Sequence, residues 1–107
     1  MDEQIVLCGA SAYTKKYFFN PDFSILPQRI QDELHILCVL FTEDIGGVLT
    51  LFFDREGTLC IHTEAAENDA SYDEIGAVLK IRKMQEEKRE LFESLELFYR
   101  VFQQDVI

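Results

Sequence analysis

Two β-rich runs separated by a four-residue loop constrain the fold of this chain more than any other feature. Residues 48–53 (VLTLFF) and 58–63 (TLCIHT) flank the loop Asp-Arg-Glu-Gly. β-branched and aromatic residues favour strands, and Gly57 can take the left-handed backbone conformation that closes a type I turn followed by a bulge. The pattern therefore predicts an antiparallel hairpin.

A helix is predicted over residues 27–45, before the hairpin. Pro27 suits the first helical position, and the Gly-Gly pair that follows the segment is a common helix end. Helical spacing predicts a core-facing stripe made of Ile30, Leu34, Leu37, Phe41 and Ile45. Ile36, Val39 and Leu40 lie on the opposite side, so we expect this helix to be covered on two sides.

Shorter β signals precede this helix. Residues 5–8 (IVLC) form an apolar run that suits either a strand or a docked segment of chain, and residues 9–12 have the composition of a turn. Residues 15–20 (KKYFFN) predict a strand that ends at an Asn-Pro pair.

The C-terminal third predicts a long helix. Apolar residues follow alternating steps of four and three from Ala77 to Phe102, interrupted only by Lys88. One helix from Ser71 to Phe102 would be about 48 Å long, whereas a compact domain of this size is roughly 34 Å across. We therefore expect either a break near residues 84–90 or an overhang that packs against a second subunit.

These elements together predict a single α+β domain over residues 1–107, in the order β-α-β-β-α. We expect an antiparallel sheet covered on one face by the 27–45 helix and by the long C-terminal helix or helix pair. The chain is 48% hydrophobic, which is enough apolar material for a core.

The charge balance restricts the kinds of partner. Twenty acidic residues against ten basic ones give a formal charge of -10, which repels nucleic acids and anionic membranes and favours basic proteins. No segment reaches the roughly 18–20 apolar residues of a membrane span, and the acidic N-terminus does not suit a signal peptide. Three cysteines in apolar contexts predict buried thiols in a reducing cytoplasm.

Residues 62–76 (HTEAAENDASYDEIG) contain no Lys or Arg. Their carboxylates belong to Glu64, Glu67, Asp69, Asp73 and Glu74. Ser71 and Glu74 have the spacing of a helix capping box, and the stretch lacks the glycine of a calcium loop. Two interpretations stay open, namely a helix cap with a solvated loop and an acidic surface that docks a basic partner.

No other motif predicts chemistry. The pairs His35/Cys38 and Cys60/His62 lack zinc-finger spacing, and Cys8 has no recognisable base or activating environment. The chain also has no phosphate-binding or nucleophile-elbow motif. We therefore expect no catalytic, metal-binding or cofactor-binding residue.

The apolar surface predicts self-association as a homodimer, because a small sheet cannot cover two wide apolar helices. The candidate oligomer interface comprises Ile36, Val39, Leu40, Leu91, Leu95, Phe98 and Phe102. The alternative is that the C-terminal stripe packs on the inner face of the hairpin within one subunit.

Four stretches carry a resemblance, VLCGASAYTKKYFFNP, ELHILCVLFTEDIGG, YDEIGAVLKI and ELFESLELFYRVF, and they span almost the whole chain. On these stretches the chain resembles a small uncharacterised bacterial family, a domain of unknown function. The resemblance implies a bacterial cytoplasmic setting and brings no activity or cofactor. The segment GGVLTLFFDREGTL is also similar to hairpins of roadblock-type and other small α+β dimerisation modules.

These observations predict a non-enzymatic cytoplasmic interaction module, a homodimer whose acidic surface docks a basic protein as an inhibitor or immunity protein would. One alternative is a small-molecule-binding protein or enzyme, with a pocket between sheet and helices that holds polar groups such as His62, Tyr13 or Tyr72. The other is a purely structural subunit of a larger complex.

Overall fold

A computed structural model describes residues 4–106 of the chain and the side chains of residues 4–102. The strands are β1 (Ile5–Ser11), β2 (Lys16–Phe19), β3 (Val48–Phe53) and β4 (Leu59–Glu64). The helices are a short 3-10 helix η1 (Pro21–Phe23) and the α-helices α1 (Gln28–Ile45), α2 (Glu74–Glu87) and α3 (Arg89–Val106).

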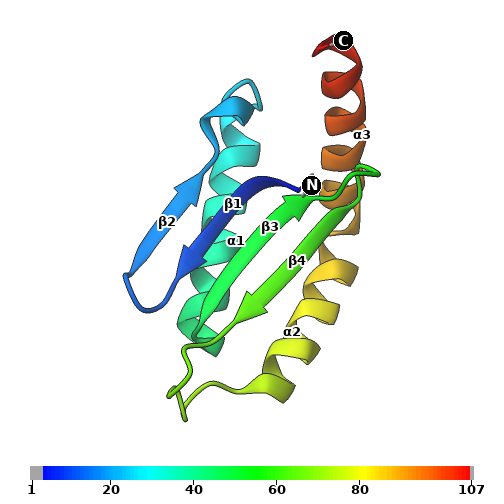
Figure 1. The fold of residues 1–107 in the computed structure, drawn as a ribbon. Helices are drawn as coiled ribbons and strands as arrows, with labels where there is room; N and C mark the ends of the chain where they lie inside the picture. The colour runs from blue at the N-terminus through cyan, green and yellow to red at the C-terminus, as the bar shows by residue number, and fades with distance from the viewer. Residues whose placement is uncertain (1–3, 107) are drawn as a thin grey trace.

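The α-helices pack on one face of a four-stranded sheet, and within the described residues no helix covers the opposite face (Figure 1). The strand order is β2-β1-β3-β4, and each neighbouring pair is antiparallel. The α+β class and the antiparallel sheet are confirmed. The observed order is β-β-α-β-β-α-α, because the N-terminal segment forms a strand pair and the C-terminal helix is divided.

The predicted turn at residues 9–12 is wrong, because Gly9 and its two successors belong to β1. A Cβ atom on Gly9 would come within 2.6 Å of the carbonyl oxygen of Leu49 in β3. Glycine is therefore required there by the close approach of two strands rather than by a turn. The chain reverses at 12–15 instead, where Lys15 has a positive φ of 58°.

The predicted hairpin is confirmed as β3 and β4, which pair from Val48↔Glu64 to Phe53↔Leu59. Asp54 organises the loop, since its Oδ1 accepts hydrogen bonds from the backbone N–H groups of Glu56 and Thr58 at 2.9 and 3.0 Å. Gly57 has the predicted positive φ, 83°.

The core lies between the sheet and the helices. Leu49, Leu51 and Phe53 alternate along β3, and each is fully buried. The ring of Phe53 stacks on that of Tyr99 in α3, with a centroid distance of 4.2 Å and an interplanar angle of 1°. Burial of each such side chain stabilises the fold by about 1.5–3 kcal/mol. Leu34 of α1 packs into the same core.

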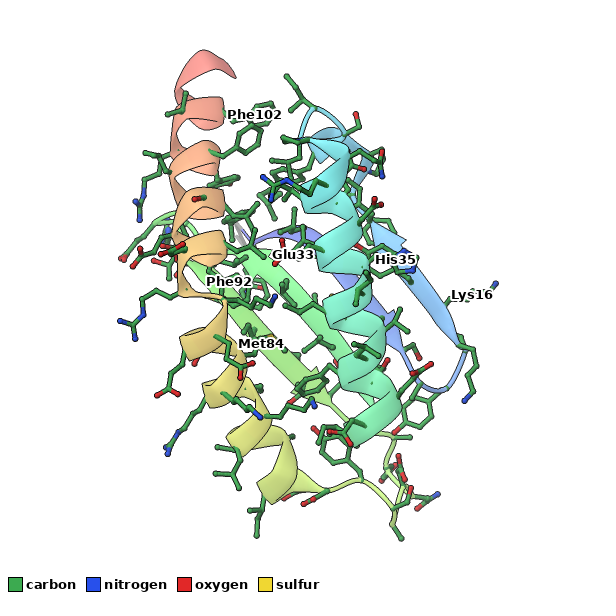
Figure 2. The ribbon with its side chains drawn as sticks, turned by 180° about the vertical axis from the view of Figure 1, so that it is seen from behind. Lys16, Glu33, His35, Met84, Phe92 and Phe102 are labelled. Atoms are coloured by element: carbon green, nitrogen blue, oxygen red, sulfur yellow. The ribbon has the colours of Figure 1, made fainter. Side chains whose placement is uncertain are left out.

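The long C-terminal helix breaks at Lys88, inside the predicted interval. Lys88 leaves helical geometry, with φ −109° and ψ 23°, and its ammonium group lies 3.0 Å from Glu33 of α1. The break lets α2 and α3 follow the sheet as two shorter helices beside α1 (Figure 2).

Candidate functional site

The acidic loop between β4 and α2 lies at one end of the sheet (Figure 1). Four of its five predicted carboxylates line one shallow depression of about 470 Å³, together with Tyr72 and Val78. We call this depression the acidic hollow; its carboxylates belong to Glu64, Glu67, Asp69 and Glu74. Its lining residues include no Lys or Arg.

Asp69 is held by the chain itself. Its carboxylate accepts hydrogen bonds from the hydroxyl groups of Ser71 and Tyr13, both at 2.6 Å. The hydrogen bond from Ser71, followed by that from Tyr13, lowers the pKa of Asp69. The hydrogen bond to Asp69 in turn raises the pKa of Tyr13. Tyr13 also accepts a hydrogen bond from the N–H of Ala66 at 2.8 Å, so this cluster ties the β1–β2 turn to the acidic loop.

Asp73 has a structural role as well. It is the N-cap of α2, and its Oδ1 accepts a hydrogen bond from the N–H of Gly76 at 2.8 Å. The predicted Ser71–Glu74 capping box is therefore wrong. Because α2 begins at Glu74, Ser71 is two residues too early to act as the cap, and its side chain binds Asp69 instead.

The three glutamates of the hollow remain exposed. Glu67 and Glu74 take part in none of the hydrogen bonds or ion pairs found among the described residues, and Glu64 lies 3.5 Å from His62 Nε2. Two apolar side chains of α2 project beside them, since Ile75 is 75% exposed and Val78 is 52% exposed. The hollow thus combines unneutralised negative charge with apolar surface.

A second depression, of about 650 Å³, separates α1 from α2. In Figure 2, Glu33 of α1 and Met84 of α2 lie on the facing sides of the two helices. We call it the α1–α2 groove; its apolar lining consists of Ile36, Leu37, Leu40, Phe41 and Met84. Charges of both signs form its rim, namely Arg29, Asp32, Glu33, Lys80, Lys83, Glu87 and Lys88.

The predicted oligomer interface divides into two groups. Ile36 and Leu40 are 60% and 56% exposed on the outer side of α1, and Val39 is half-buried. The residues from α3 face inward, because Leu95 is 2% exposed and Leu91, Phe98 and Phe102 are half-buried. Leu97, also in α3, is 62% exposed, and the periodic pattern did not identify it as a candidate interface residue.

The cysteine and histidine pairs are not arranged for zinc. Cys38 is buried against Cys8, while His35 stacks on Tyr17 at a centroid distance of 4.1 Å. Among the side chains of residues 4–102, no three His, Cys, Asp or Glu are grouped so that they could hold a metal ion. No helix of the described chain is long and apolar enough to cross a membrane.

A family model described as a family of unknown function, DUF6145, matches residues 4–106. The chain belongs to the DUF6145 family. The match spans nearly the whole chain and confirms the resemblance to a small uncharacterised domain. None of the curated proteins and none of the solved structures matches this DUF6145 chain. Any functional argument for it therefore comes from the geometry of its own residues.

Proposed function

We propose that this DUF6145 chain is a protein-interaction module that docks a basic protein at the acidic hollow. The observation that carries the proposal is the state of Glu64, Glu67 and Glu74. They line one concave surface, they are exposed, and among the described residues no Lys or Arg lines that surface.

Charge and shape would contribute to different steps of binding. The formal charge of -10 attracts a cationic partner over a distance set by the ionic strength, and so raises the association rate. At contact, a Lys or Arg side chain of the partner can enter the hollow, while Ile75 and Val78 provide apolar contact beside it. This division suits an inhibitor or immunity-type protein that neutralises a basic target.

Self-association through the α1–α2 groove is part of the same proposal. Ile36 and Leu40 are four residues apart on α1 and form an exposed part of the groove's apolar lining. The groove is the place where a second acidic copy meets cations, because Arg29 and Lys83 line it without an ion pair among the described residues. A homodimer formed there would leave the acidic hollow open to the basic partner.

The test is an affinity capture from a lysate of the organism that encodes the chain, washed at about 0.05 M and about 0.5 M salt, which shortens the Debye length roughly threefold. Three proteins are compared: the wild type, the hollow variant Glu64→Gln/Glu67→Gln/Glu74→Gln, and the control Glu43→Gln/Glu86→Gln/Glu93→Gln. The control removes the same charge from exposed carboxylates outside the hollow.

The proposal predicts that the wild type and the control retain the same basic protein at low salt and release it at high salt. Exposed ion pairs contribute about 0.2–1 kcal/mol each, so the hollow variant should bind it roughly three- to a hundredfold more weakly. Equal capture by the two triple variants, or retention that ignores salt, would contradict the acidic hollow as the docking site.

A further inference from the structure

Two buried cysteines on different elements lie in contact between the sheet and α1. Cys8 is in β1 and Cys38 is in α1, both are fully buried, and their Sγ atoms are 3.7 Å apart. Neither residue contributes to the acidic hollow or to the α1–α2 groove. We propose that Cys8 and Cys38 are an oxidative modification site, at which a small hydroperoxide converts the two thiols into a disulfide that joins β1 to α1.

The two sulfur atoms lie close to bonding distance. A disulfide requires an S–S distance of about 2.05 Å, so the sulfurs have to approach by about 0.8 Å each. The two elements are already packed against each other in the core, since both residues belong to the same buried cluster. The bond would close a loop over the 30 positions that separate the two cysteines.

A buried hydroxyl group lies beside the two sulfurs. The Tyr17 hydroxyl of β2 has no well-formed hydrogen bond among the described residues. Burial, followed by the proximity of Cys8 and Cys38 and by a contact with the Cys8 sulfur, raises the pKa of this tyrosine, so it stays a hydrogen-bond donor. A thiol sulfur is a weak acceptor, and the oxygen of a sulfenic acid formed on either cysteine would be a stronger one.

The route for a small oxidant runs between β2 and α1. A crevice of about 290 Å³ is lined there by Tyr17, His35 and Thr42, among others, and the Tyr17 and His35 rings stack at a centroid distance of 4.1 Å. Neither cysteine lines this crevice, so an oxidant reaches the sulfurs when β2 opens locally. β2 is a four-residue edge strand paired only with β1, so its local opening costs less than opening the core. Oxidation is slow while β2 stays closed, because both sulfurs are fully buried and because the hydrogen bond to Cys8, and then burial, raises the pKa of the Cys38 thiol.

The chemistry balances with one hydroperoxide molecule. One cysteine sulfur attacks a peroxide oxygen, the O–O bond breaks, and for hydrogen peroxide the products are a sulfenic acid and one water. The second sulfur attacks the sulfenic sulfur, the S–S bond forms, and the hydroxyl group leaves with the second thiol proton as another water. Two electrons pass from the two sulfurs to the peroxide.

The test measures whether the folded chain favours this disulfide. Full-length protein carrying Cys60→Ser, which removes the third thiol, is brought to equilibrium in glutathione redox buffers, once folded and once in concentrated urea. After quenching, intact-mass spectrometry measures the fraction of the protein that has lost two hydrogen atoms and therefore contains the disulfide. By linkage, the ratio of the two disulfide equilibrium constants equals the factor by which the bond stabilises the fold.

A well-fitted disulfide stabilises a fold by roughly thirtyfold to a thousandfold in the folding equilibrium, so a ratio well above one is expected. A ratio of one or below would overturn the proposal, because the native packing would then resist the bond.

Matched chains with Cys8→Ser or Cys38→Ser should show no loss of two hydrogens. Under hydrogen peroxide, Tyr17→Phe should form the disulfide more slowly than its parent, and an unchanged rate would contradict a role for the hydroxyl group.

Discussion

The acidic hollow and the α1–α2 groove both border α2, yet they differ in how their charges are paired. In and beside the groove some charges neutralise each other, since Lys80 lies 2.7 Å from Asp44 and Lys88 lies 3.0 Å from Glu33, while Arg29 and Lys83 have no ion pair among the described residues. Among the described residues, no Lys or Arg lines the hollow. The charge that a partner can use is therefore set by which side chains lack a partner inside the chain, and a count of acids overstates it.

The two groups of apolar residues predicted as an oligomer interface also differ. The α3 residues pack inward on the sheet, whereas Ile36 and Leu40, which line the groove, stay exposed. The first set contributes to folding, and the second set is available for association. Four measurements can break or sharpen these contrasts.

The largest effect is expected from a substitution in the α3 stripe. Leu95→Ala should lower the free energy of unfolding by about 2–5 kcal/mol, because it leaves a cavity in the core. Ile36→Ala, at an exposed position, should change it by less than about 0.5 kcal/mol. Urea denaturation at two protein concentrations measures both values, and similar losses for the two variants would contradict the assignment of Leu95 to the core.

Next in size is the effect on self-association. Ile36→Glu combined with Leu40→Glu should weaken the proposed dimer at least tenfold, or about 1.4 kcal/mol, because two charges replace exposed apolar contacts. Sedimentation equilibrium measures the change. The hollow variant Glu64→Gln/Glu67→Gln/Glu74→Gln is the control and should associate like the wild type. Loss of the dimer in the control alone would place the interface at the hollow.

A smaller effect on stability is expected from replacing the carboxylate that caps α2, compared with the exposed carboxylate next to it. Asp73→Ala removes the N-cap of α2 and should cost about 1 kcal/mol of stability, within a range of 0.5–2. Glu74→Ala removes only a charge near the helix N-terminus, which is worth about 0.3–1 kcal/mol. Thermal unfolding of the two variants measures the order, and a larger loss for Glu74→Ala would contradict the assigned cap.

The smallest effect is a pH dependence from Asp69. Its pKa is lowered in the folded chain, so its hydrogen bonds stabilise the fold above the unfolded pKa of about 3.9 and are lost as the pH falls through the folded value. Urea midpoints measured from pH 6 downward should therefore fall more steeply, below about pH 4, for the wild type than for Asp69→Asn. Parallel curves would show that the Ser71 and Tyr13 hydrogen bonds contribute nothing.

The sequence correctly predicted those elements that are determined by residues close together in the chain. The hairpin follows from two β-rich runs around Gly57, and the break near Lys88 follows from a polar interruption in an apolar stripe. The turn predicted at Gly9 was wrong, because glycine is needed there for the close approach of Leu49 from β3. That contact joins residues 40 positions apart.

The site was only partly predictable for the same reason. The sequence placed five carboxylates in one stretch, and four of them do line one hollow. It could not separate Asp69 from its neighbours, because the hydrogen bond from Tyr13 joins residues 56 positions apart. Nor could it show that Ile36 stays exposed while Leu95 is buried, since both lie on apolar helical stripes.

An amide chemical-shift map of the isotope-labelled chain, recorded while the captured basic protein is added, shows directly whether the acidic hollow is the docking site. If it is, the shifts will concentrate at residues 64–78, around Glu64, Glu67, Glu74 and Val78, and will disappear at about 0.5 M salt as screening increases. Shifts confined to the α1–α2 groove or to the open face of the sheet, with no change at the hollow, would contradict this assignment.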